Sequence, residues 1–104
     1  METGKQDLLN SYMKPFNWNS NKNHQLIKER GISFEEIVFC LQSDGLLDDI
    51  SHPNNEKYAH QRIFVVAIDD YVYLVPYVET ETEIFLKTVI PSRKATKQYF
   101  GDNL

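Results

Sequence analysis

A polar segment and the strand predicted after it hold the first residues that could do chemistry: Glu56, Lys57, His60 and Arg62. A carboxylate, an imidazole and a guanidinium in one place can supply general acid–base catalysis and stabilise charge on a phosphate. Cleavage of RNA through the ribose 2′-hydroxyl needs both. A polar loop is more often ordinary solvated surface, so the spacing alone leaves both interpretations open.

A second group of cations lies near the C-terminus. Arg93, Lys94 and Lys97 fall within about one and a half turns of a predicted helix, and Tyr99 and Phe100 follow them. Cations in the first turn of a helix oppose its macrodipole, and a bound phosphate or an acidic patch would offset their cost. The alternative is a basic helix that only faces solvent.

Trp18 and the histidines complete the candidates. Trp18 can be a lid on the core or a platform on which a nucleic-acid base stacks. The histidines lie in three different predicted elements and lack the spacing of a metal-binding pair, so we predict no metal site and no cofactor. They are His24, His52 and His60.

Local signals place two helices before the strands. Asn19 is a natural N-cap for a helix over Ser20 to Arg30, which Gly31 can end in the left-handed conformation. Ser33 and Glu36 form a capping box ahead of an apolar face with helical spacing, which predicts a second helix that ends near Ser43.

Runs of β-branched and aromatic residues predict strands at Gln61–Ile68, Tyr71–Val78 and Glu83–Ile90, with a short one at Leu46–Ile50 and another at Phe16–Trp18. The connections between the three long runs are short, so these strands must be antiparallel neighbours. Pro76 cannot donate to a ladder, which predicts a bulge or an unpaired stretch there.

Ser92 is the expected N-cap of a short C-terminal helix that ends by Gly101. The fold class is therefore α+β: two N-terminal helices, an antiparallel β-meander of three to five strands and a short C-terminal helix. A chain of 104 residues suits one domain, which we place at 14–104, behind a flexible arm over 1–13.

Charge and cysteine content exclude several classes of protein. Cys40 is the only cysteine, so no intrachain disulfide can form, and the absence of an apolar run of about 20 residues predicts a cytoplasmic protein without a membrane span. No Gly-rich phosphate loop or Ser-centred nucleophile elbow is present. The net charge of −4 comes from residues 31–90, with three Lys/Arg against eleven Asp/Glu, whereas both ends are basic.

The order of several motifs resembles the BrnT family of toxins. These are Phe16-x-Trp18, the segment GISFEE from Gly31, Arg62 at the start of an apolar strand, and SRKAT from Ser92. The resemblance covers roughly Lys14 to Tyr99. It implies a RelE-like ribonuclease that needs no metal, the toxin of a type II toxin–antitoxin system, which a ribbon-helix-helix antitoxin neutralises.

The resemblance points to Trp18, Arg62 and Arg93, with Glu56 and Lys94 beside them, and the residue types add His60, Lys97 and Tyr99 to the expected site. Arg62 and Arg93 would lie side by side on an open surface and stabilise the scissile phosphate, with His60 or Glu56 for proton transfer. Trp18, Lys94, Lys97 and Tyr99 would bind RNA. The partners would be RNA and the antitoxin, with DNA contacted only through the antitoxin complex. The alternative is a non-catalytic module that binds protein or nucleic acid through the same basic helix.

Overall fold

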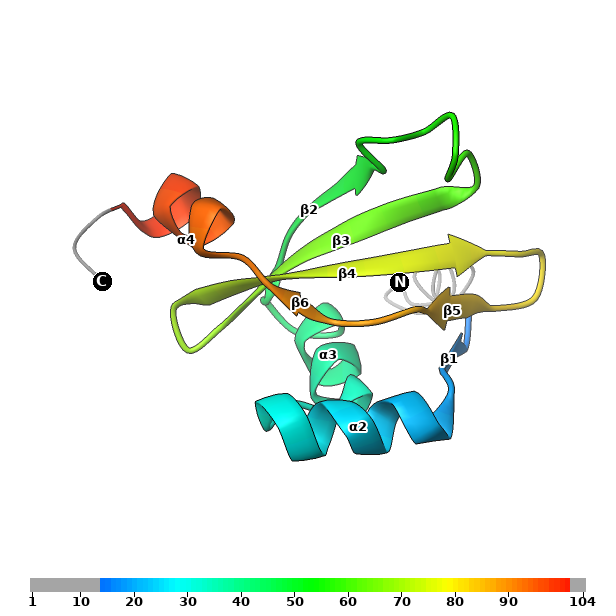
Figure 1. Cartoon of the computed structure of the whole chain (residues 1–104), viewed down its shortest axis with the longest axis horizontal. Helices are drawn as coiled ribbons and strands as arrows, with labels where there is room; N and C mark the ends of the chain where they lie inside the picture. The colour runs from blue at the N-terminus through cyan, green and yellow to red at the C-terminus, as the bar shows by residue number, and fades with distance from the viewer. Residues whose placement is uncertain (1–13, 102–104) are drawn as a thin grey trace, which may run out of the picture.

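Helices cover both faces of a six-stranded sheet in this protein (Figure 1). The computed structural model describes residues 14–101, and the arm predicted over residues 1–13 lies outside them. Within the described residues, two helices near the N-terminus pack on one face of the sheet and the last helix packs on the other. The α+β class and this order of helices are confirmed.

Helix α2 spans Ser20–Arg30, as its capping residues predict. The Asn19 side chain accepts a hydrogen bond from the backbone N–H of Lys22, and Gly31 ends the helix with φ of 66°. Arg30, the last residue of α2, donates a hydrogen bond from its guanidinium group to the carbonyl of Val89. This bond connects α2 to the segment that precedes Ile90.

Helix α3 spans Phe34–Leu41 and has the predicted capping box between Ser33 and Glu36. The predicted end near Ser43 is slightly too late, because the chain turns after Leu41 and the N–H groups of Ser43 and Gly45 both donate to the Cys40 carbonyl. A Cβ atom at Gly45 would stand 2.8 Å from that of Cys40. The turn therefore needs glycine to bring the chain from α3 into the sheet.

The sheet has the order β1-β5-β4-β3-β2, with β6 paired to β4. The predicted antiparallel meander is present in β2, β3, β4 and β5, but β1 pairs with β5 in parallel, so the sheet is mixed rather than purely antiparallel. The strands are β1 Phe16–Asn17, β2 Leu46–Ser51, β3 Gln61–Ile68, β4 Tyr71–Glu79, β5 Ile84–Leu86 and β6 Ile90–Pro91.

The strand predicted at Glu83–Ile90 is two short strands, β5 and β6, and Pro76 explains the break. The N–H of Lys87 donates to the Pro76 carbonyl over 2.8 Å, but proline has no N–H to return the bond. The pairing with β4 then resumes one residue out of step, from Tyr77 opposite Leu86 to Leu74 opposite Ile90. The predicted irregularity at Pro76 is confirmed.

The β3–β4 hairpin closes through Asp69 and Asp70, which have φ of 52° and 63°. Two successive left-handed residues match the right-handed twist of the flanking strands, and Asp tolerates this conformation better than most residues. The tight turn predicted at these two positions is confirmed.

Alternation along the strands divides the core into two parts. On the α3 side, Phe64 and Val66 of β3 pack with Val75 and Tyr77 of β4. On the opposite side, Val65 of β3 and Val72 of β4 pack with Ala95. Side chains at even positions of β3 therefore face α3, and those at odd positions face the last helix. None of the described helices has the length and apolar character needed to cross a bilayer.

Helix α4, Arg93–Phe100, is fixed to the sheet by its buried residues Ala95 and Thr96. The Thr96 hydroxyl accepts from the N–H of Val72 over 2.9 Å and donates to the Ser92 carbonyl over 2.7 Å, while Ser92 caps the helix as predicted. These bonds hold α4 in one orientation on β4 and leave Arg93 and Lys94 exposed.

Asn23 links α2 to the start of α3. Its side chain accepts from the buried N–H of Phe34 over 2.7 Å and donates to Glu35 Oε1 over 2.8 Å. The bond from Asn23 is the main cause that lowers the pKa of Glu35. Since this pKa is lower in the folded protein, the stabilisation is present above the unfolded pKa and is lost as the pH falls through the folded value.

We expect Asn23→Ala to lower the free energy of unfolding by about 1–3 kcal/mol, because the Phe34 N–H is left buried and unpaired. The Glu35 pKa should move up toward its ordinary value. Urea unfolding and an NMR titration of the carboxyl group would measure the two effects. Gln25→Ala, on the exposed face of α2, is the matched control, and an equal loss in both variants would contradict the role of Asn23.

Candidate nucleic-acid interface

The two arginines expected to meet at one site lie on opposite faces of the sheet. Arg62 of β3 is opposite Tyr77 of β4 and shares a face with Phe64, toward α2 and α3. Arg93 opens α4, which packs against the other face over Val65 and Val72. The expectation of a shared phosphate site was therefore wrong. Arg62 stands at an even position of β3, and side chains at these positions face away from α4.

Arg62 binds the edge strand β2 through hydrogen bonds to Asp49. Its Nε donates to Asp49 Oδ1 over 3.1 Å and its Nη2 to the Asp49 carbonyl over 2.9 Å, and the Tyr77 hydroxyl donates to the same carboxylate over 2.7 Å. Asp48 Oδ1 accepts from the N–H of Asp49. The side chain of Arg62 is 48% exposed, but the adjacent carboxylate offsets its charge. Arg62 thus has a structural partner in place of a phosphate.

This cluster also shifts two pKa values. Burial, followed by the hydrogen bond to Asp49, raises the pKa of Tyr77 far above its usual range. The hydrogen bond to Asp49 is the first cause that raises the pKa of Arg62. Tyr77 is therefore a neutral hydrogen-bond donor to Asp49 at neutral pH.

Glu56 and His60 lie on the loop between β2 and β3, which projects away from α4 (Figure 1). Both side chains are exposed. The loop is ordered instead by His52, whose Nδ1 accepts from the N–H of Asn54 and whose ring lies 4.4 Å from that of Tyr58. The structure therefore places the two proton-transfer candidates near Arg62 but apart from Arg93.

Trp18 lies over the core on the α3 side. Its ring stacks on Phe34, with centroids 5.6 Å apart and an angle of 24° between the planes. Phe34 thus covers one face of the indole. Trp18 lies on the side of the sheet opposite to α4. Of the two interpretations left open for Trp18, the structure favours the lid on the core.

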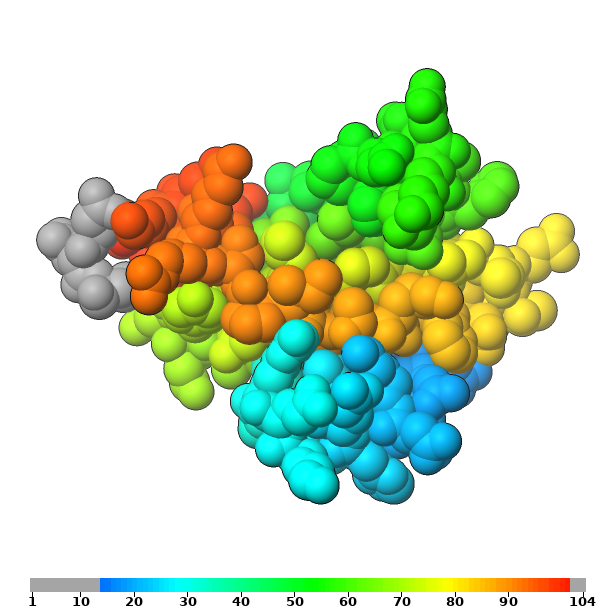
Figure 2. Space-filling view, viewed as in Figure 1, coloured from blue at the N-terminus to red at the C-terminus, as the bar shows by residue number. Residues whose placement is uncertain are grey.

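A groove of about 300 Å³ lies between α4 and the sheet, and two of the remaining candidates line it. Lys94 and Tyr99 line it from α4, and Asp48 lines it from β2. Figure 2 shows α4 (orange to red) and the β2–β3 hairpin (green) rising on either side of a hollow. The remaining lining residues are Ile50, Val65, Leu74, Ser92, Ala95 and Gln98. Arg93 at the exposed start of α4, and Lys97 one turn further along, do not line this groove, because they lie on a different face of the helix from Lys94 and Tyr99.

A β-bulge turns Asp48 toward α4. Leu46 is opposite Val66, but Asp48 is opposite Val65, so Leu47 is the extra residue in β2. A regular strand would place Asp48 on the same face as Leu46, toward α3. With the bulge, Leu47 packs in the α4-side core and Asp48 lines the α4 groove. Bulges often re-aim a side chain beside an active site.

The charges of the groove suit a phosphodiester. Lys94, the one cation among residues 14–101 that lines the groove, is exposed in the first turn of α4, where the helix dipole already favours an anion. Tyr99 is 44% exposed and offers an aromatic face for a base. Asp48 adds a carboxylate that can accept a proton. The groove therefore combines phosphate attraction, stacking and a base.

The sequence did not indicate that Asp48 belongs to the site. In the sequence, Asp48 and Asp49 look like the polar end of a short strand. The only signal would have been that Leu47 is apolar where strict alternation from Leu46 calls for a polar residue. Among residues 14–101, no group of three or more His, Cys, Asp or Glu side chains is arranged to hold a metal ion.

Comparison of the chain with protein-family models, with curated proteins and with solved structures finds no match. The geometry of the α4 groove and the order of motifs along the chain are therefore the basis for a function.

Proposed function

We propose that this protein is the toxin of a type II toxin–antitoxin system, with a RelE-like fold, and that it cleaves RNA in the groove between α4 and β2. The observation that carries the proposal is the bulge at Leu47, which puts Asp48 into the same groove as Lys94 and Tyr99. A carboxylate, a cation and an aromatic ring thus surround one space large enough for a nucleotide segment.

Each residue has a distinct role in the proposed reaction. Asp48 takes the proton from the ribose 2′-hydroxyl, and the 2′-oxygen attacks the phosphorus in line with the 5′-oxygen, which departs and takes a proton from solvent water. Lys94 and Arg93 stabilise the negative charge that builds on the phosphate. Tyr99 stacks on a neighbouring base. The products are a 2′,3′-cyclic phosphate and a 5′-hydroxyl end.

The cellular setting follows from the resemblance to BrnT toxins. The protein acts in the cytoplasm, and a ribbon-helix-helix antitoxin binds and neutralises it. The complex, and not the toxin alone, contacts operator DNA. The residues proposed for the reaction require neither a metal ion nor an organic cofactor.

A second candidate is a non-catalytic module that binds RNA or protein through α4. The separation of Arg62 from Arg93 favours it, because the expected pair of catalytic guanidinium groups is not assembled and Asp49 pairs with one of them. This candidate predicts RNA binding without strand cleavage. Detection of cyclic-phosphate ends separates the two functions directly.

The double variant Arg93→Ala, Lys94→Ala is expected to abolish growth arrest and to weaken binding of single-stranded RNA about tenfold or more at low salt, because fewer phosphate charges are neutralised. The salt dependence of the affinity should also become shallower by roughly 0.7 per lost phosphate contact. Growth after induction, RNA integrity and fluorescence anisotropy over a salt series would measure these effects.

The double variant Lys22→Ala, Lys28→Ala on α2 removes the same charge from the opposite side of the sheet and should behave like the wild type. Intact cellular RNA and normal growth with the wild-type protein, in the absence of an antitoxin, would rule out the toxin proposal. Equal losses in both double variants would show that the effect comes from net charge and not from the groove.

A further inference from the structure

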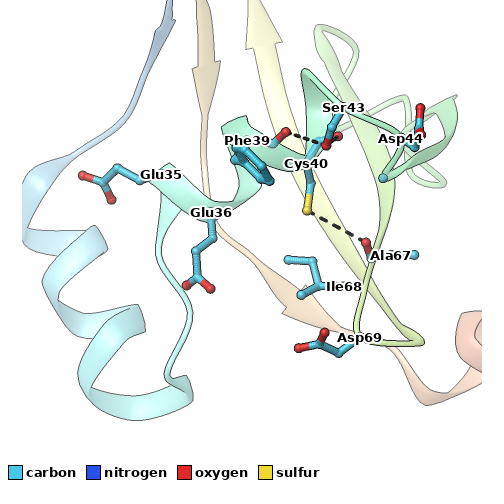
Figure 3. A pocket seen from close by; sticks show the side chains of 10 residues that line it. Glu35, Glu36, Phe39, Cys40, Ser43, Asp44, Ala67, Ile68 and Asp69 are labelled. Atoms are coloured by element: carbon cyan, nitrogen blue, oxygen red, sulfur yellow. Dashed lines mark hydrogen bonds between the residues drawn. The ribbon is translucent and has the colours of Figure 1, made fainter.

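A second groove lies on the other side of the sheet from α4. It has a volume of about 790 Å³ and runs between α3 and the end of the β3–β4 hairpin (Figure 3). Its floor is largely apolar, formed by Cys40, Ala67 and Ile68. The proposed RNA reaction uses none of these residues.

Carboxylates rim this groove without a compensating cation. Glu35, Glu36, Asp44 and Asp69 line it, and no Lys, Arg or His between residues 14 and 101 does. In Figure 3, the carboxylates of Glu36 and Asp69 face the same opening from α3 and from the hairpin turn. Burial is the largest cause that raises the pKa of the Cys40 thiol, and the charges of Glu36 and Asp69 are the next causes. The groove is therefore a region of negative potential.

Phe39 stands exposed on this acidic rim. Its relative exposure is 72%, whereas Phe34 on the same helix is fully buried. The position of Phe39 is fixed, since α3 is capped at Ser33 and packs through Phe34 and Ile37. A large apolar side chain on a rigid helix, beside an apolar floor and charged neighbours, is typical of a surface that a partner covers.

We propose that this groove, the α3 groove, binds a basic segment of a partner protein. An apolar side chain of that segment covers Phe39 and the floor at Ile68, while a Lys or Arg lies between Glu36 and Asp69. Charge complementarity selects this occupant: a nucleic acid would be repelled by the rim. The inference does not rest on the proposed RNA cleavage, because the two grooves are on opposite faces of the sheet.

Two variants remove the two proposed components of the surface. Phe39→Ala removes the aromatic contact. The pair Glu36→Gln, Asp69→Asn removes two charges, while Gln preserves the capping box and Asn accepts the left-handed turn. Their matched controls are Ile27→Ala, an exposed apolar residue of α2, and Glu81→Gln, an exposed carboxylate outside the groove.

The probe is a fluorescent synthetic peptide of Lys and Leu, with a Glu–Leu peptide as its charge-reversed counterpart. The Lys–Leu peptide should bind the wild type and both controls equally, and Phe39→Ala and Glu36→Gln, Asp69→Asn at least tenfold more weakly. The Glu–Leu peptide should not bind. Equal affinity for all variants would overturn the proposal, because attraction to net charge alone would then explain the binding.

Cys40 gives an independent readout, since it is the only thiol of the chain and lines the groove. The Lys–Leu peptide should slow maleimide labelling of Cys40, and an unchanged rate under saturating peptide would overturn the proposal. Analytical ultracentrifugation without peptide completes the test. A dimer that dissociates in Phe39→Ala would show that a second copy of this chain, and not a basic partner segment, covers the groove.

Discussion

Phe34→Ala is expected to lower the free energy of unfolding by about 3–5 kcal/mol, the cost of a large cavity in a core. Phe34 is fully buried, it stacks against Trp18, and it packs in the cluster that joins α2 and α3 to the sheet. Domains of this size have total stabilities of about 5–15 kcal/mol, so the variant should lose a large share of its stability. Thermal unfolding by circular dichroism would measure the loss.

Phe39→Ala is the matched control for this prediction. It makes the same substitution on the same helix, but at an exposed position, and should change stability by about 0.5 kcal/mol or less. A loss below about 1 kcal/mol for Phe34→Ala would mean that the core can collapse around the missing ring. The docking of α3 against β3 and β4 would then be weaker than its packing indicates.

Asp48→Asn is expected to lower the rate of RNA cleavage about 10²–10⁴-fold, the usual contribution of a positioned general base. The affinity for RNA should stay within a few fold of the wild type, because asparagine keeps the size of the side chain and removes a negative charge beside the phosphate. Single-turnover cleavage of a labelled RNA, with affinity measured separately, would resolve the two quantities.

Asp44→Asn, an exposed carboxylate of the turn after α3, is the control for net charge and should cleave RNA normally. If Asp48→Asn cleaves at the wild-type rate, Asp48 is not the base. The bulge at Leu47 would then have only a packing role.

The helices were predictable because their signals are local. Asn19, the Ser33–Glu36 capping box and Ser92 each set a helix start through a side chain within three residues of the amide it accepts from. The hairpin at Asp69 and Asp70 was predictable for the same reason. The end of α3 near Ser43 was predicted to within two residues, whereas the close approach of Gly45 to Cys40 depends on the folded chain and could not be predicted.

Features that depend on pairing between distant strands were only partly predictable. Pro76 indicates that a ladder must fail somewhere, but not that β5 and β6 separate opposite it. The parallel pairing of Phe16 with Ile84 joins segments with no local connection between them. Sequence alternation cannot reveal either arrangement, because both strands of a pair are needed to define the register.

The site was the least predictable part, and for a related reason. Asp48 lies one position from a residue that faces the opposite side of the sheet, so the one-residue bulge at Leu47 decides which helix its side chain meets. Lys94 and Tyr99 were correctly placed near each other because both belong to one short helix. Asp48 joins them only through the irregular register of β2.

The hydrogen bonds around Asp49 also affect whether the sheets of two copies of this protein can pair edge to edge. β2 is the last strand of the sheet, and its pairing register turns the N–H and C=O of Asp49 outward. Asp48 and Arg62 already occupy those two groups. A foreign strand would have to displace both before it could extend the sheet. These contacts thus hinder the pairing of a second chain with the middle of the β2 edge.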